Sequence, residues 1–214
     1  MSSTWRTNMK QNPIIYDVLV VSPGGVGCSY FMKQLNKYGI KTNHGGDMDG
    51  LKHKPTPKQI INKTVRAKKC IFIWNDPLFA ILSHFRRTWQ YCQCKKLGNP
   101  YQFTSPLTKE KWIQKTMLAE KDTFGIERQW NEWYRLRNSL PIPIYFLDFR
   151  RMNDPLIKRE LSKFIPLSYD NINKIQYSKR NSIKDDIPDS IVQIYERLDK
   201  HVMDCIQLER TQQQ

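Results

Sequence analysis

The sequence predicts a three-layer α/β/α protein built around a central, mainly parallel sheet. Three apolar runs, at residues 16–21, 70–74 and 142–149, have the length of strands, and the second lacks polar alternation, as expected of a strand covered on both faces. Helical patterns of ten or more residues separate the runs, which is the spacing of parallel βαβ units. Ligands of such sheets bind at the carboxyl ends of the strands.

The first half of the chain alternates between strands and helices. The segment at 27–38 carries apolar residues at helical spacing, and two prolines stand at helix starts, where a missing N–H is tolerated. In chain order we expect a strand at 16–21, a helix at 27–38, a short strand at 39–44, a helix from Pro57, a strand through Trp74 and a helix from Pro77 to about Cys94.

The second half begins with a polar segment at 97–110, long enough to be a loop that faces a substrate. We then expect a helix at 111–138, a buried strand at 142–149, a helix capped by Asp154 and begun by Pro155, and a closing amphipathic helix. The 214 residues are predicted to form one domain, 1–214, with a flexible segment at 1–14 and a tail at 210–214.

Composition narrows the possible partners. Lys and Arg number 35 against 20 Asp and Glu, and the net charge of +15 raises the concentration of anions at the surface. No zinc-finger spacing, RNA-binding aromatic motif or basic heptad region accompanies this charge, so we do not expect nucleic acid as a partner. Because the first residues lack an apolar signal core, no run could span a bilayer and the five cysteines fit reduced thiols, we expect a cytoplasmic protein.

The stretch "SPGGVGCS", residues 22–29, follows the first strand and opens the first helix. The N–H groups of such a glycine-rich turn attract an anion together with the helix dipole, and Ser29 stands at the hydroxyl position of the phosphate-binding pattern GxxxxGK[ST]. Cys28 replaces the lysine, and Asp148, late in the chain, is the nearest candidate for a magnesium carboxylate. The missing lysine and the lack of a convincing magnesium carboxylate both weigh against a kinase or ATPase. A glycine turn without a ligand is the alternative.

A second motif stands at the end of the strand at 70–74. Asn75, Asp76 and Pro77 are followed by Ser83, six residues after the proline. Together with the turn, this motif resembles the sulfotransferase superfamily, whose enzymes bind 3′-phosphoadenylyl sulfate (PAPS) through a P-loop-like turn and an Arg-x-Pro motif with a later serine. The resemblance follows the order of elements along most of the chain and is specific in these two motifs. It implies a P-loop NTPase-like fold.

The resemblance also implies which residues bind PAPS. The turn would surround the 5′-phosphosulfate, whereas the second motif and a basic segment before the last helix would hold the 3′-phosphate. The implied residues are Pro23, Gly24, Gly25, Val26, Gly27, Cys28, Ser29, Tyr30, Asn75, Ser83, Arg180 and Ser182. Asn75 replaces the family's arginine, so a neutral amide stands where a charge-assisted contact is expected. Lys179, Arg86 and Arg87 are further candidate cations, and a solvated surface position is the alternative for them.

Transfer of a sulfuryl group to a hydroxyl or amine calls for a general base near the acceptor. The family that this chain resembles uses a His or Glu near the end of an early strand, and His44 ends the predicted second strand. We predict His44 as the base, with Asp47 orienting it or acting in its place; a polar turn without a role is the alternative, and His53 is a weaker candidate. No metal site is expected, because Cys92 and Cys94 lack the partners that zinc requires.

Together these observations predict a PAPS-dependent sulfotransferase, with PAPS as co-substrate, no metal, and a small molecule or glycan as the unidentified acceptor. Two alternatives stay open. A divergent P-loop nucleotide kinase would use the same scaffold, and a non-catalytic nucleotide- or anion-binding protein would keep the turn without turnover. Magnesium-independent binding of adenosine 3′,5′-bisphosphate separates the sulfotransferase from the kinase.

Overall fold

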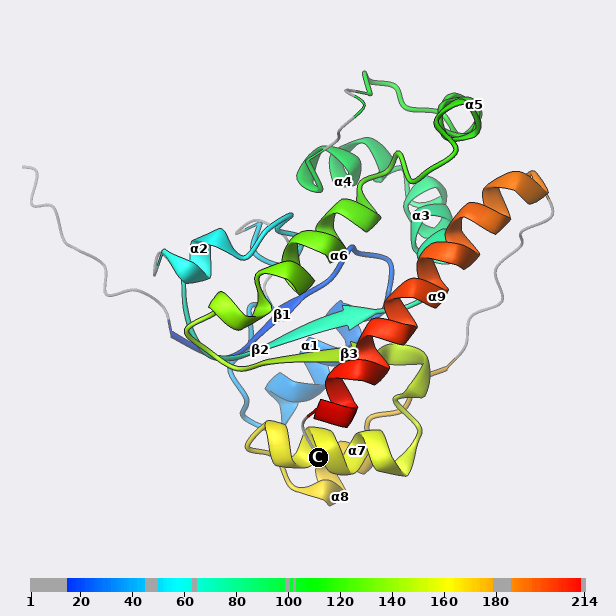
Figure 1. Ribbon diagram of the computed structural model, residues 1–214. Coiled ribbons are helices and arrows are strands. Elements are labelled where there is room, and N and C mark those ends of the chain that lie inside the picture. The colour runs from blue at the N-terminus through cyan, green and yellow to red at the C-terminus, as the bar shows by residue number, and fades with distance from the viewer. Residues whose placement is uncertain are drawn as a thin grey trace, which may run out of the picture.

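The computed structural model describes residues 15–44, 50–62, 65–98, 101, 103–178 and 186–212. They form a mixed α/β structure in which helices surround a three-stranded parallel sheet (Figure 1). The strands β1 (Ile15–Val21), β2 (Arg66–Trp74) and β3 (Ile144–Asp148) pair in the order β1-β2-β3. The parallel sheet that the three apolar runs predicted is confirmed.

The central strand β2 is apolar because both of its faces are covered. Its side chains from Cys70 to Trp74 are all buried, as the lack of alternation predicted. The register places Phe72 beside Val21 of β1 and Phe146 of β3, so one layer of apolar side chains crosses the sheet. This core fixes where the three strands end, and therefore where the segments that follow them meet.

Helices cover the sheet and connect its strands. They are α1 (Cys28–Lys37), α2 (Lys58–Ile61), α3 (Pro77–Arg86), α4 (Gln90–Lys96), α5 (Lys109–Ala119), α6 (Ile126–Arg135), α7 (Pro155–Phe164), α8 (Tyr169–Asn173) and α9 (Asp189–Gln212), with 3-10 turns η2 (Arg137–Ser139) and η3 (Phe149–Arg151). In Figure 1, α6 and α9 pass in front of the sheet, and α1 lies behind it. The helices predicted after the first strand, from Pro155 and at the end of the chain are confirmed.

The short strand predicted at 39–44 is reduced to one parallel bridge, between Thr42 and Val18. Beyond the bridge, the Asn43 side chain takes the place of a backbone partner for β1. Asn43 Oδ1 accepts from Val20 N at 2.7 Å, and Asn43 Nδ2 donates to Val20 O at 2.9 Å. Val18 pairs with Lys69 of β2 and also with Thr42, so β1 lies between the two; the chain runs from β1 to one side and then crosses to β2 on the other side. Such a reversal marks the crevice in which α/β sheets bind ligands.

Two predicted helices are each broken in two. Thr88, whose φ is 58°, separates α3 from α4 within the helix predicted to reach Cys94. The helix predicted at 111–138 stops at Ala119, and the buried Asp122 carboxylate then accepts hydrogen bonds from the N–H groups that open α6. Capping by a side chain and a left-handed residue satisfy the backbone groups where the chain turns, and these local contacts override the helical pattern.

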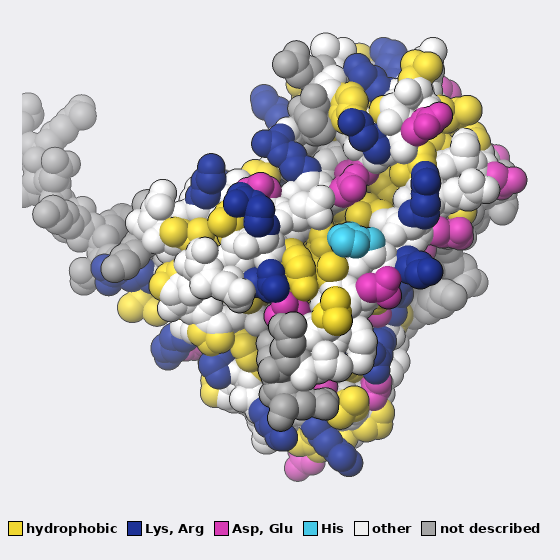
Figure 2. Space-filling model, viewed as in Figure 1, with side chains coloured by type: hydrophobic (Ala, Val, Ile, Leu, Met, Phe, Trp, Pro, Cys, Tyr) yellow, Lys and Arg dark blue, Asp and Glu magenta, His cyan; other side chains and the backbone are white. Residues whose placement is uncertain are grey.

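The surface charge is dispersed on the face shown in Figure 2. Lys and Arg side chains are spread there among Asp and Glu side chains and do not gather over one element. Within the described ranges, no helix has both the length and the apolar character that crossing a membrane requires.

Candidate functional site

A cavity of about 390 Å³ lies at the carboxyl ends of the strands, a volume within the range of small-molecule sites. It is formed by the turn after β1, the start of α3 after β2, Phe149 after β3 and residues 176–178. The predicted PAPS-binding residues that line it are Gly25, Val26, Gly27, Cys28, Ser29, Tyr30, Asn75 and Ser83. Pro23 and Gly24 are buried and do not line it, whereas Arg180 and Ser182 lie outside the described residues.

The glycine turn presents its backbone to this cavity. In the part of the chain that the structure describes, none of the N–H groups of residues 25–29 donates a hydrogen bond, and α1 has no side-chain cap. The turn is fixed from behind, since Gly24 N donates to Ser22 Oγ at 3.2 Å and Gln93 Nε2 donates to Pro23 O at 2.8 Å. Successive unpaired N–H groups at a helix N-terminus can bind an anion.

Two glycines of the turn pack too closely for any side chain. At Gly25, whose φ is 74°, a Cβ would lie 2.7 Å from Ala80 O, in the backbone of α3. At Gly27, whose φ is 94°, a Cβ would lie 2.5 Å from Phe149 Cε1. The turn is therefore held between the segments that follow β2 and β3, and the glycines are required by packing as well as by backbone conformation.

The segment that follows β2 contributes the polar groups of the second motif to the cavity wall. Asn75 and Ser83 are buried, and Asn75 Oδ1 accepts from Asp76 N at 2.8 Å, so Asn75 Nδ2 is the atom that can donate to a ligand. Arg87 also lines the cavity; its Nε donates to Ser83 O at 2.9 Å, and its guanidinium lies 5.1 Å from the centre of the Trp89 ring. Arg87 thus brings a cation to the wall where Asn75 supplies none.

Aromatic side chains form another part of the wall. Phe79, Phe149 and Tyr177 line the cavity, and the rings of Phe149 and Tyr177 meet edge to face with centres 5.4 Å apart. Asn153 holds the backbone of Tyr177, accepting from Tyr177 N at 2.9 Å and donating to Tyr177 O at 2.8 Å. The sequence pattern pointed to Lys179, Arg180 and Ser182, which come next, and assigned no role to residues 176–178.

Lys52 lies beside the glycine turn, which the sequence pattern did not indicate. Its Nζ lies 3.5 Å from Ser29 Oγ, although Lys52 belongs to the segment that follows the Thr42 bridge in the sequence. Ser22 N donates to Lys52 O at 2.9 Å, and two side chains of α6 donate to Lys54 O at 2.8 and 2.9 Å. A turn without a lysine of its own therefore has an ammonium beside it. The basic cluster "LKHK" was the available signal.

The structure does not bring the predicted base to this cavity. His44 lines a separate surface depression with residues 39–42, and Asp47 lies outside the described residues. His53 is buried behind the turn, with Nδ1 2.9 Å from Ser22 O. Because a carbonyl oxygen only accepts, Nδ1 carries the proton of the neutral ring and Nε2 is the basic nitrogen.

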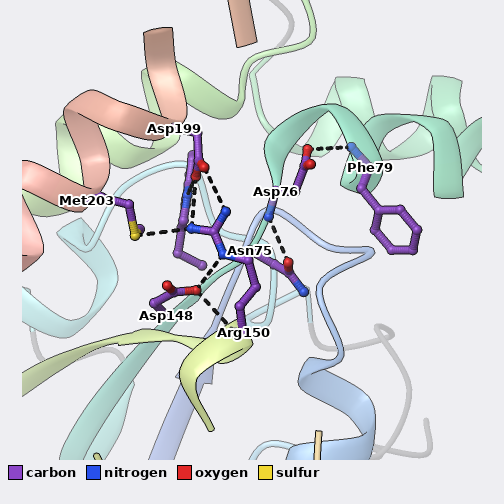
Figure 3. Close-up of polar contacts among 8 residues, drawn as sticks. Asn75, Asp76, Phe79, Asp148, Arg150, Asp199 and Met203 are labelled. Atoms are coloured by element: carbon purple, nitrogen blue, oxygen red, sulfur yellow. Dashed lines mark hydrogen bonds and ion pairs between the residues drawn. The ribbon is translucent and has the colours of Figure 1, made fainter. Parts of the chain in front are cut away.

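Asp148, the nearest candidate for a magnesium carboxylate, is engaged by an arginine (Figure 3). Arg150 Nε donates to Asp148 Oδ1 at 2.8 Å, and its terminal nitrogens donate to Asp199 at 2.7 and 3.1 Å. Burial lowers the pKa of Arg150, but the hydrogen bonds and charges of Asp199 and Asp148 outweigh it, so this pKa is raised. Among the described residues, no group of three His, Cys, Asp or Glu side chains could hold a metal.

His84 packs against the back of the turn as a neutral ring. It stacks on Phe124 with ring centres 5.9 Å apart, and a Cβ on Gly24 would lie 2.7 Å from its Nε2. Burial, together with the charges of Arg87 and His53, lowers the pKa of His84 to about 3. A proton on this ring is therefore unfavourable in the folded protein.

We expect His84 to make the fold sensitive to acid. The unfolded chain binds a proton near the ordinary pKa of 6.5, whereas the folded chain does so only at about 3, so the free energy of unfolding falls as the pH drops through this window. The loss from this residue is up to about 1.4 kcal/mol per pH unit. Urea denaturation between pH 7 and pH 4.5 should give a shallower dependence for His84→Gln than for the wild type. Equal slopes would contradict the expectation.

Comparisons with models of protein families, with curated proteins and with solved structures find no match to this chain. Within the described residues, the N–H groups of 25–29 donate no hydrogen bond; Lys52 lies beside Ser29, and Arg87 lines the cavity together with aromatic side chains. This set of groups suits a ligand that combines anionic groups with an aromatic ring, as a phosphorylated nucleoside does.

Proposed function

We propose that the protein is a PAPS-dependent sulfotransferase with a three-layer, P-loop NTPase-like fold. The observation that carries this proposal is the union, in one cavity, of the glycine turn with Asn75 and Ser83. Those are the two motifs on which the resemblance to the sulfotransferase superfamily rests. They are far apart in the chain, so their meeting is not a consequence of sequence proximity.

In this proposal the two ends of the donor are held by different walls. The N–H groups of residues 25–29 would bind the 5′-phosphosulfate, as expected of an uncapped helix N-terminus. Asn75 Nδ2, the Ser83 hydroxyl and the Arg87 guanidinium would bind the 3′-phosphate, with Arg87 supplying the charge that Asn75 lacks. The purine ring would pack against Phe79 or Tyr177.

In the transfer step an acceptor oxygen or nitrogen attacks the sulfur of PAPS. The bond between this sulfur and the bridging phosphate oxygen breaks, and adenosine 3′,5′-bisphosphate leaves. The acceptor loses its proton to a base. Neither His44, which lines another depression, nor His53, which is buried behind the turn, lines the cavity, so we assign this base to neither histidine.

The rival functions differ from this one in their demands on the site. A kinase needs positive charge and a magnesium carboxylate at the β- and γ-phosphates, yet position 28 is a cysteine and Asp148 is paired with Arg150. A non-catalytic nucleotide-binding protein would use the same cavity, so it is separated from an enzyme only by turnover.

Calorimetric titration with adenosine 3′,5′-bisphosphate and with ATP, each with and without magnesium, tests the proposal. We expect the bisphosphate to bind without magnesium and at least about tenfold more tightly than ATP. Ser83→Ala should weaken its binding by up to about tenfold, the value of one hydrogen bond. Preferential binding of magnesium–ATP would support the kinase, and binding of neither nucleotide would reject both enzymes.

A further inference from the structure

The turn lacks a cation of its own, and the structure places one beside it from another part of the chain. Lys52 Nζ lies 3.5 Å from Ser29 Oγ. Ser29 is exposed and lines the cavity, one residue after the cysteine that replaces the loop lysine. The ammonium therefore lies at the same turn as the unpaired N–H groups.

The environment of Lys52 is unusual for a lysine. The residue is only 9% exposed, and the Ser29 hydroxyl is a neutral and distant acceptor. Across the described ranges, no Asp or Glu forms an ion pair with it. Burying an ammonium without a counter-charge is unfavourable. An anion bound at the turn would remove this penalty.

The position of Lys52 is fixed by its backbone and does not depend on a ligand. Ser22 N, at the exit of β1, donates to Lys52 O at 2.9 Å. Two residues on, Lys54 O accepts from Gln129 Nε2 at 2.8 Å and from Trp133 Nε1 at 2.9 Å. The segment is thus clamped between the turn and α6, which keeps the backbone of Lys52 beside the turn in the free protein.

We propose that Lys52 supplies the positive charge that the turn lacks and recognises the 5′-phosphate group of the nucleotide. This inference rests on the proposed function, because it concerns one end of the same donor site. An ammonium–phosphate hydrogen bond is about twice as strong as a neutral one. Lys52 should therefore discriminate between nucleosides with and without a 5′-phosphate, whereas Asn75, Ser83 and Arg87 should respond to the 3′-phosphate.

The test compares two ligands, adenosine 3′,5′-bisphosphate and adenosine 3′-monophosphate, which differ only in the 5′-phosphate. Calorimetry gives the dissociation constant of the monophosphate divided by that of the bisphosphate. This ratio is measured for the wild type, for Lys52→Met and for Lys54→Met. Lys54→Met is the control. It removes the same charge from the same segment, but the contacts of Lys54 with α6 are made by its backbone carbonyl oxygen, which the substitution keeps. We expect Lys52→Met to reduce the ratio by about tenfold or more, from weaker bisphosphate binding alone, and Lys54→Met to change it by less than about twofold.

Thermal unfolding of the free variants gives a second readout. Because Lys52→Met removes a buried charge that has no ion pair among the described residues, it should unfold at the wild-type temperature or above. A lower unfolding temperature, or an unchanged ratio of dissociation constants, would overturn the role of Lys52 while leaving the proposed function intact. Failure of the wild type to bind the bisphosphate would overturn the proposed function, and this inference with it.

Discussion

Gly25→Ala will lower the free energy of unfolding by about 3 kcal/mol and remove measurable binding of adenosine 3′,5′-bisphosphate. A left-handed backbone costs a residue with a Cβ about 1–2 kcal/mol, and overpacking adds about 1–3 kcal/mol. Both costs apply, because φ is 74° and the new Cβ would lie 2.7 Å from Ala80 O and 3.0 Å from Ala80 Cα. These are backbone atoms of α3, which cannot rotate away, so the turn itself must move.

Gly39→Ala is the matched control for this substitution. Gly39 has a φ of 82°, but nothing lies within 4 Å of a Cβ built there. It should therefore show only the conformational cost, about 1–2 kcal/mol, and should keep wild-type binding of the bisphosphate. Urea denaturation and calorimetry of both variants provide the measurement. Equal losses of stability in the two variants would mean that the turn is not held against α3 as described.

Arg150→Met is expected to lower the free energy of unfolding by about 3 kcal/mol, because it leaves a buried carboxylate without its counter-charge. The side chain of Asp148 is 5% exposed and that of Asp199 is 24% exposed. Arg150 pairs with both carboxylates, and it thereby connects the end of β3, which carries Asp148, to α9, which carries Asp199 (Figure 3). Guanidinium chloride would screen these charges, so urea denaturation is the appropriate measurement.

The neighbouring arginine gives the control. Arg151 pairs with Asp154 at 2.6 Å, but both side chains are more exposed, at 40% and 30%. Arg151→Met should therefore cost no more than about 1 kcal/mol. Asp148→Asn added to Arg150→Met should restore part of the loss, because it removes the unpaired charge. If Arg150→Met costs no more than Arg151→Met, the network contributes little to stability.

The three strands of the sheet and the burial of the central one could be predicted from the sequence, whereas the reduction of the segment at 39–44 to one bridge and the breaks between helices could not. An unalternating apolar run such as Cys70 to Trp74 reports burial directly, and the structure confirms it. The break before α6 depends on Asp122, whose carboxylate is also bonded to Tyr195 of α9, far away in the chain. A contact of that kind leaves no local pattern to recognise.

The same distinction applies to the candidate site. The glycine turn and the Asn75-to-Ser83 motif are local patterns, and they line one cavity. Lys52 is held at the turn by contacts of its segment with Ser22 and α6, and Tyr177 is held at the cavity by contacts of its backbone with Asn153, all of them distant in the chain. Sequence position alone favoured His44 at the end of a strand, but the Asn43 side chain ends the ladder there and His44 lies in another depression.

The central claim is that the turn between β1 and α1 binds the 5′ end of an adenine nucleotide. A crystal structure of the complex with adenosine 3′,5′-bisphosphate tests it most directly. The expected result is a 5′-phosphate within hydrogen-bond distance of the N–H groups of residues 25–29 and of Lys52 Nζ, with the 3′-phosphate near Ser83 and Arg87. A nucleotide bound in the depression beside His44, or anywhere else away from the turn, would contradict the account.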